Sequence, residues 1–533
     1  MMTSRLCLTL LVVGGSAASV QPAVTAKKAA SFRVRAPAVV PQRHSVSLVA
    51  LGCPKNTVDA EVMLGDLQRH GLRVVDEPTE DDVVIVNTCA FVEDAKSESI
   101  AAVIEAAELK AERSAPAKGL FVTGCLAQRY ADELAAELPE VDAVVGFEHY
   151  ADLPSQVLEL LASADAAAAA EGSAADDEGA ADEAAAGLGR VLVGSASVPF
   201  RSEETRVRLT ASHTAYIRVA EGCDHACTFC AIPGFRGAFR SKPFDVVLAE
   251  AERLVESGVR ELNLIAEDTN QFGSDWGASD PRRLADLLHA LAAMPKLRWI
   301  RLLYCYPSYF SRELFDAIAS IDKVVKYIDI PLQHLSPTVL QRMRRPKAAS
   351  TVNLLRRLRQ RIGPSLVLRT TFICGFPGET DAEHEELHAL AEELRFERGG
   401  AFAFSKEEGT PAASLEAQID EPTKQARRDR LIALFQDTAA EWAEAQVGKE
   451  LRVMIDRVDE EAGDAIGRTE ADAPAIDGSV LLPGCAHLAP GTELLVTVTA
   501  ADVMELVATP STSARAAAYF SAPPPADADG GEE

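Results

Sequence analysis

Three cysteines fall within eight residues of the sequence EGCDHACTFC, which occupies residues 221–230. The spacing of Cys223, Cys227 and Cys230 lets three thiolates surround one compact metal centre. A structural zinc site needs four ligands, usually from two separated cysteine pairs, whereas three cysteines with no fourth nearby leave one position open. The spacing therefore favours an iron–sulfur cluster with an open corner for a reacting molecule. A zinc site that borrows a distant ligand is the alternative.

Three further cysteines each end a short apolar run. The runs at residues 46–52, 83–88 and 119–124 lead to Cys53, Cys89 and Cys125, which are 36 residues apart each time. Helical patterns lie between them, and strands that alternate with helices at this spacing predict a parallel sheet. Ligands gather at the carboxyl ends of the strands in such sheets, so these thiols can meet at one edge and hold a second cluster. The alternative is that these three cysteines are unrelated small residues of the core.

The first cysteine group follows a candidate strand that begins a second α/β domain. Candidate strands lie at residues 216–219, 261–265, 298–303, 326–330, 367–373 and 401–404, with amphipathic helices between them. Six such units predict a partial (βα)6 barrel, and barrels place their chemistry at the carboxyl ends of the strands. Three of those ends carry candidate groups: Glu267 and Asp268, then Gln333 and His334, then Gly375 and Gly378.

Composition divides the chain into six parts. We expect a targeting leader at residues 1–44, an α/β domain at 45–160, an acidic Ala-rich spacer at 161–189, the barrel domain at 190–446, a small all-β barrel at 447–508 and a disordered tail at 509–533. The formal net charge of −27 argues against nucleic-acid binding through a globally basic surface. Ten cysteines in 533 residues are too few for a disulfide scaffold, which favours a reducing compartment.

The leader lacks acidic residues, since the first is Asp59, whereas it carries several lysines and arginines. A short apolar stretch at residues 6–13 precedes its basic part, an order that resembles plastid-targeting leaders. We therefore expect a plastid protein, with a mitochondrial presequence or a wrongly chosen start codon as alternatives. No later apolar run is long enough to span a membrane, so we expect no membrane association.

The cysteine motifs resemble those of a known enzyme family. CxxxCxxC after a first barrel strand resembles the radical S-adenosyl-L-methionine (SAM) enzymes. The segments GCPKNTVD (52–59), NTC (87–89) and TGC (123–125) resemble the amino-terminal domain of the methylthiotransferases, and residues 447–508 resemble the TRAM domain.

The resemblance implies two 4Fe-4S clusters and SAM. One cluster would be held by Cys53, Cys89 and Cys125; the other, held by Cys223, Cys227 and Cys230, would bind SAM at its open iron. Glu267 and Asp268 would hold the SAM amino group, and the segment with Gly375 and Gly378 would lie beside its adenine. Arg369 is a candidate partner for the SAM carboxylate.

The segment at residues 466–478 resembles the ribosomal type of the family, which implies a substrate aspartate in the twelfth protein of the small ribosomal subunit. An electron donor and a sulfur donor would also be needed. The last β domain carries twelve acids against four bases, which would repel tRNA. We expect Asp459, Glu460 and Glu461 to attract a basic ribosomal protein. The alternatives are a tRNA adenosine methylthiotransferase and a non-catalytic iron–sulfur protein that docks on ribosomes.

Overall fold

A computed structural model describes residues 44–75, 82–111, 118–171, 190–195, 200 and 206–516. Most of the expected leader, most of the expected spacer and most of the expected tail lie outside these residues. No helix in the described ranges is long and apolar enough to cross a membrane.

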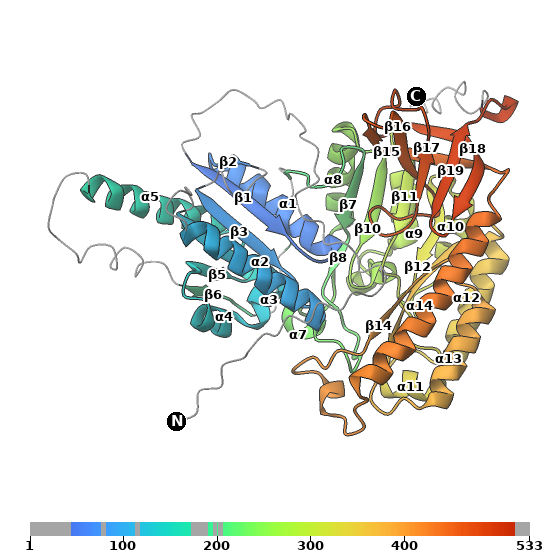
Figure 1. The fold of residues 1–533 in the computed structure, drawn as a ribbon, viewed down its shortest axis with the longest axis horizontal. Coiled ribbons are helices and arrows are strands. Elements are labelled where there is room, and N and C mark those ends of the chain that lie inside the picture. The colour runs from blue at the N-terminus through green and yellow to red at the C-terminus, as the bar shows by residue number, and fades with distance from the viewer. Residues whose placement is uncertain are drawn as a thin grey trace.

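The first domain is a parallel six-stranded sheet covered by helices (Figure 1). Its strands are β1 (Ser45–Ala50), β2 (Arg73–Val74), β3 (Val83–Thr88), β4 (Gly119–Thr123), β5 (Ala143–Val145) and β6 (Val191–Leu192), in the order β2-β1-β3-β4-β5-β6. The main helices are α1 (Pro54–Arg69), α2 (Glu93–Ala111), α3 (Gly124–Arg129), α4 (Ala131–Glu137) and α5 (Leu153–Glu171). The three strands expected to end in cysteine are neighbours in this sheet, so their carboxyl ends lie at one edge.

Helix α5 crosses the expected start of the spacer at residue 161, and the expected start of the barrel domain at residue 190 falls just before a strand of the first sheet. In this helix Leu161 is buried, and Asp165 pairs with Lys118 (Oδ1–Nζ 2.9 Å). On the far side β6 pairs in parallel with β5, so the chain returns to the first sheet before it enters the barrel. The low-complexity composition of residues 161–189 did not indicate where α5 ends, although alanine extends a helix readily. Strand β6 lies beyond that segment, and two residues leave no periodic signal.

The second domain is the expected partial barrel. Its strands are β7 (Thr214–Arg218), β10 (Glu261–Ile265), β11 (Trp299–Leu302), β12 (Val324–Asp329), β13 (Val367–Cys374) and β14 (Arg398–Ala403), all parallel and in chain order from β7 to β14. Its main helices are α8 (Phe244–Glu256), α9 (Leu284–Ala292), α10 (Arg312–Ser320), α11 (Pro337–Arg342), α12 (Ala348–Ile362), α13 (Asp381–Leu394) and α14 (Glu421–Glu444). A short ribbon of β8 (Ala220–Glu221) and β9 (Arg240–Ser241), with helix α7 (Ile232–Arg236), carries the cysteine loop between the two domains (Figure 1).

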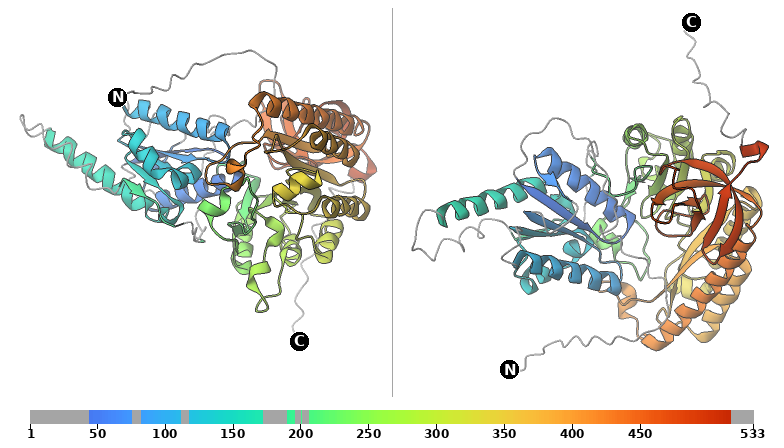
Figure 2. Two further views of the ribbon diagram at one scale, coloured as in Figure 1. Left: turned by 90° about the horizontal axis from the view of Figure 1, so that it is seen from below. Right: turned by 45° about the horizontal axis from the view of Figure 1, so that its top comes forward.

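The last domain is a closed five-stranded barrel of β15 (Glu450–Asp459), β16 (Asp464–Thr469), β17 (Ser479–Leu482), β18 (Glu493–Asp502) and β19 (Glu505–Pro510). Strand β19 extends past residue 508, so the expected tail begins too early, because Thr509 and Pro510 still pair with β18. The views of Figure 2 place this barrel against the second domain, on the side away from the first sheet.

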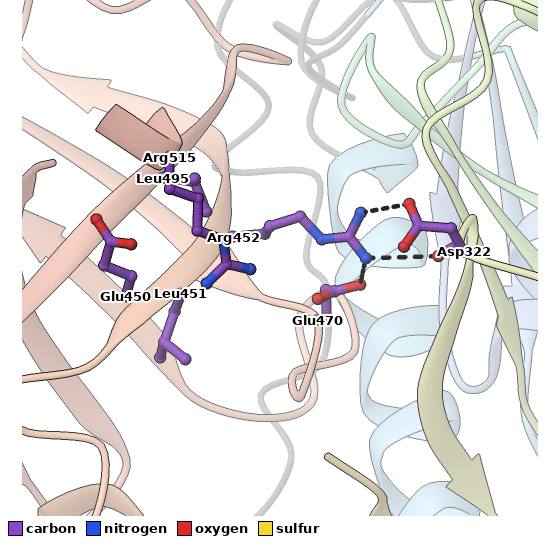
Figure 3. A pocket seen from close by; sticks show the side chains of 7 residues that line it. All are labelled: Asp322, Glu450, Leu451, Arg452, Glu470, Leu495 and Arg515. Atoms are coloured by element: carbon purple, nitrogen blue, oxygen red, sulfur yellow. Dashed lines mark hydrogen bonds and ion pairs between the residues drawn. The ribbon is translucent and has the colours of Figure 1, made fainter. Parts of the chain in front are cut away.

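Buried ion pairs hold the small barrel to the second domain. The segment after β16 presents Asp472 to Arg398 (Oδ1–Nη2 2.7 Å) and Asp477 to the hydroxyl of Tyr327 (2.7 Å). A surface hollow at the same seam is lined by Asp322, Glu450, Leu451, Arg452, Glu470, Leu495 and Arg515 (Figure 3). It contains no cysteine and lies outside the candidate site.

We predict that Asp472→Ala destabilises the protein by about 3–5 kcal/mol, because Arg398 would keep a buried charge without its partner. Asp472 also accepts hydrogen bonds from Thr469 and Gly478, which adds to the loss. Denaturant unfolding measures the change. Glu460→Ala, an exposed acid of the same domain, is the control and should alter stability by less than about 0.5 kcal/mol. Equal effects of the two substitutions would contradict this account of the seam.

Candidate functional site

The first cysteine triad lies at the carboxyl edge of the first sheet. Cys53 precedes α1, Cys89 follows β3, and Cys125 is in the first turn of α3. Burial raises the pKa of the Cys125 thiol to about 11, although the nearby Arg236 opposes that rise. The pKa of Cys89 is raised further by burial and by negative charge on Cys125 and Cys53. The structure thus brings the three sulfurs within electrostatic reach of one another, with Cys89 and Cys125 buried and Cys53 partly exposed.

Two glycines make room for this triad. Gly52 has φ +90°, and a Cβ there would lie 2.8 Å from Cys89 Cβ and 2.9 Å from its Sγ. Gly124 has φ +93°, and a Cβ there would lie 2.3 Å from the carbonyl oxygen of Thr88. Only a glycine adopts such a backbone at this closeness without strain. The glycine before Cys53 therefore lets Cys89 approach, and the one before Cys125 lets β3 and β4 end side by side.

The second triad is in the loop between β8 and α7. Gly222 has φ +75°, and the N–H of Cys223 donates to the carbonyl of Gly237 (3.0 Å), which closes the loop on itself. Burial raises the pKa of Cys223 and of Cys230 to about 12, and neighbouring negative groups add to both shifts. Phe229 packs against a buried apolar cluster, which anchors the loop in the barrel.

Glu267 and Asp268 follow β10 and face the second triad. Glu267 adds to the raised pKa values of both Cys223 and Cys230. Both of its carboxylate oxygens are buried, and no described residue donates a hydrogen bond to them. Asp268 accepts from His225 (Oδ2–Nε2 2.7 Å), and the His225 ring stacks on Tyr306 with 3.6 Å between centroids. The second oxygen of Asp268 has no described donor either. Such unsatisfied buried acceptors suit a cationic ligand group.

The glycine segment after β13 forms a tight turn. Gly375 has φ +74°, and its N–H donates to Glu379 Oε2 (2.7 Å). Gly378 has φ +76° and donates to the carbonyl of Ala417 (2.7 Å). His334 is fully buried beside Glu379, and burial lowers its pKa to about 4, so the imidazole is neutral near pH 7.

The contacts described for Arg369 and for the acidic triplet involve no cysteine. Arg369 is the third residue of β13 and pairs with Asp329 (Nη1–Oδ1 2.9 Å) and with Asp477 (Nε–Oδ1 3.7 Å) of the small barrel. Asp459 ends β15 and is partly buried, whereas Glu460 and Glu461 are exposed in the turn that follows; the Asp459 carboxylate accepts two backbone N–H bonds of this turn.

The sequence did not single out the residues that join the two triads. Arg236, the last residue of α7, donates to Cys125 Sγ (3.7 Å) and lies 3.9 Å from Glu267. Lys55 reaches from α1 to the carbonyl of Ala266 (3.2 Å) and lies 3.7 Å from the ring centroid of Tyr304. Lys55 lies inside the GCPKNTVD motif and Arg236 six residues after Cys230, so proximity to a cysteine motif was the one available signal.

No three His, Cys, Asp or Glu side chains in the described ranges converge closely enough to hold a single metal ion. The fit of a metal cluster therefore rests on the donor set. Each triad offers three buried or partly buried thiols that interact electrostatically, and one arginine that donates to a sulfur: Arg236 donates to Cys125 and Arg345 Nη1 to Cys227 (3.8 Å). Residues with these properties fit an anionic iron–sulfur cluster, whose charge such donors offset.

Comparisons with known proteins agree with this architecture. Residues 45–146 match the Uncharacterized protein family UPF0004, residues 217–391 the Radical SAM superfamily and residues 447–510 the TRAM domain. The partial barrel and its cysteine loop define a radical SAM enzyme.

Curated relatives place the chain more narrowly. It is 40% identical over 472 residues to the ribosomal protein uS12 methylthiotransferase RimO of Lachnoclostridium phytofermentans, covering 87% of this chain and 99% of that one. The RimO of Desulfitobacterium hafniense is 42% identical, over 87% of this chain and 97% of that one. The chain belongs to the RimO family of methylthiotransferases. Among solved structures, the radical SAM methyltransferase TsrM of Kitasatospora setae is similar with a TM-score of 0.44 and 15% identity, over 69% of this chain and 77% of that one.

We predict that Gly52→Ala displaces the Cys89 thiol and lowers the iron bound after anaerobic reconstitution by about half, because the new methyl group would overlap Cys89. Iron analysis and the visible absorption of the protein measure the loss. Gly71→Ala is the matched control, because Gly71 has a similar φ of +89° with open space around it. Iron loss that is equal in both variants would show that backbone strain, and not the contact with Cys89, is responsible.

Proposed function

We propose that this enzyme adds a methylthio group to the β-carbon of an aspartate in ribosomal protein uS12, with two 4Fe-4S clusters and SAM. The observation that carries the proposal is the meeting of two cysteine triads from different domains around Glu267 and Arg236. The relatives are ribosomal protein uS12 methylthiotransferases, which supports the choice of uS12.

The substrate explains the need for two metal centres. The β-carbon of aspartate has unactivated C–H bonds, which acid–base catalysis at neutral pH cannot replace. When bound, the clusters and SAM would supply the electron and the carbon radical that remove hydrogen, together with the sulfur and methyl group that are added. The chain itself must hold these groups close together and exclude water.

The residues around the second triad suit SAM. The unsatisfied oxygens of Glu267 and Asp268 can accept hydrogen bonds from its ammonium group, and we assign them that role. Gly375 and Gly378 would lie beside the adenine. Arg369 would have to break its ion pair with Asp329 or with Asp477 to bind the SAM carboxylate. Its case as a SAM-binding residue is therefore weaker than that of Glu267 and Asp268.

The small barrel favours a basic protein over tRNA. Of its twelve acids, Asp456, Glu470, Asp472, Asp477 and Glu493 pair with bases. Of its four bases, Arg452 and Arg468 pair with acids. Seven acids and two bases remain, so the balance is still acidic. A surface of this charge would repel phosphates and attract a basic ribosomal protein. A sulfur donor and an electron donor complete the expected partners.

We predict separable roles for the two triads. Replacing Cys223, Cys227 and Cys230 with Ala should remove about half the iron and abolish the formation of 5′-deoxyadenosine from SAM. Replacing Cys53, Cys89 and Cys125 with Ala should also remove about half the iron, yet leave some 5′-deoxyadenosine without a methylthio product. Iron analysis and mass spectrometry measure these outcomes. Normal product from the second variant would refute the assignment of the first triad.

We also predict that reversing Asp459, Glu460 and Glu461 to Lys weakens capture of uS12 roughly tenfold at low ionic strength, with a smaller difference at high salt because exposed charges are screened. Binding at two salt concentrations measures the effect. Reversal of Asp502 and Glu505, exposed acids in the β18–β19 turn, is the matched control. Methylthio-adenosine in tRNA, with uS12 unmodified, would favour the tRNA enzyme instead.

A further inference from the structure

Arg236 reaches from one domain to the cysteine triad of the other. It ends the short helix α7, which begins two residues after Cys230, and its side chain is 2% exposed. Its Nη2 donates to Cys125 Sγ (3.7 Å) and to Asn56 Oδ1 (3.0 Å) in the first domain. The guanidinium group also lies 4.6 Å from the ring centroid of Phe147, within cation–π distance.

Carboxylates from both domains hold Arg236 in this position. Asp59 of α1 pairs with its Nη2 (3.2 Å), and Glu221 of β8 pairs with its Nη1 (3.3 Å). Arg218 of β7 shares both of these carboxylates. All four side chains are at most 5% exposed, so their geometry is set by mutual pairing. Without these ion pairs, the Arg236 side chain would not be held within reach of Cys125.

A buried guanidinium beside a metal-bound thiolate has a predictable effect. Its positive charge is poorly screened in a dry site, so it stabilises the more negative state of the group it faces. Hydrogen bonds to the sulfurs and local charge are known to set the reduction potentials of iron–sulfur clusters. Arg236 would therefore raise the potential of a cluster held by Cys125.

We propose that Arg236 is a positioning residue through which the radical SAM domain fixes the Cys125 ligand and raises the reduction potential of the cluster in the first domain. The inference rests on the proposed function, since it requires a cluster on Cys53, Cys89 and Cys125. Its consequence is that docking of the two domains and the electronic state of the first cluster are linked by a single side chain.

The test uses full-length enzyme in which Cys223, Cys227 and Cys230 are Ala, so that only the first cluster remains. A redox titration followed by electron paramagnetic resonance gives its midpoint potential. Arg236→Gln should lower that potential, because the charge and the donor to Cys125 are both lost. Arg236→Lys should lower it less, because the charge remains but a point donor cannot serve both sulfur and carboxylates. Arg345→Gln is the control, because Arg345 contacts Cys227 of the other triad in the native enzyme, and it should leave the midpoint potential unchanged.

The outcomes separate this inference from the proposed function. A parent triple variant that binds no iron would refute the first-triad cluster and the role of Arg236 with it. A parent that binds iron but has the same potential after Arg236→Gln, or a shift equal to that of Arg345→Gln, would overturn the inference alone. If Arg236→Gln binds no cluster, the midpoint potential of Arg236→Lys is the test. A potential below that of the parent supports the proposal, and a potential equal to that of the parent refutes it. A merely structural role would lower the iron content and leave the potential in place.

Discussion

The structure depends on a set of charges buried between the first domain and the barrel. Asp59, Glu221, Arg218 and Arg236 are almost inaccessible to water, and each would be costly to bury alone. They are tolerated because two carboxylates and two guanidinium groups neutralise one another across the interface. This requirement fixes how α1 meets β7 and β8. The same docking brings the cysteine edge of the first sheet to the cysteine loop of the barrel.

Much of this architecture could be predicted from the sequence. The strands that lead to Cys53, Cys89 and Cys125 carry a strong signal, because apolar runs coincide with a repeat of 36 residues and a glycine precedes two of the three cysteines. The six barrel strands could also be predicted, since amphipathic helices separate them. The short strands β2 and β6 were not predicted, because two residues show no periodicity. The segment that continues α5 was interpreted as spacer, because its Ala-rich composition does not indicate which neighbours it packs against.

The contacts between domains could not be predicted. Lys55 stands next to Pro54 in a recognised motif, but nothing in the sequence indicates that it reaches Ala266, more than two hundred residues later. The count of charged residues in the small barrel likewise did not show which of them form ion pairs. The acids of the small barrel formed one total in the sequence, whereas the structure separates Asp472 and Asp477, which hold the barrel in place, from the exposed turn after Asp459. Periodicity describes how an element is built, and composition describes a surface on average, so neither specifies which side chains meet.

The central claim is that two iron–sulfur clusters lie close together across this interface. Electron paramagnetic resonance of the fully reduced enzyme tests it most directly, by comparison with the two variants that keep one cysteine triad each. We predict that the spectrum and relaxation of the intact enzyme differ from the sum of the two variants, because neighbouring paramagnetic clusters interact. A spectrum equal to that sum, with full iron content in the intact enzyme, would contradict the account.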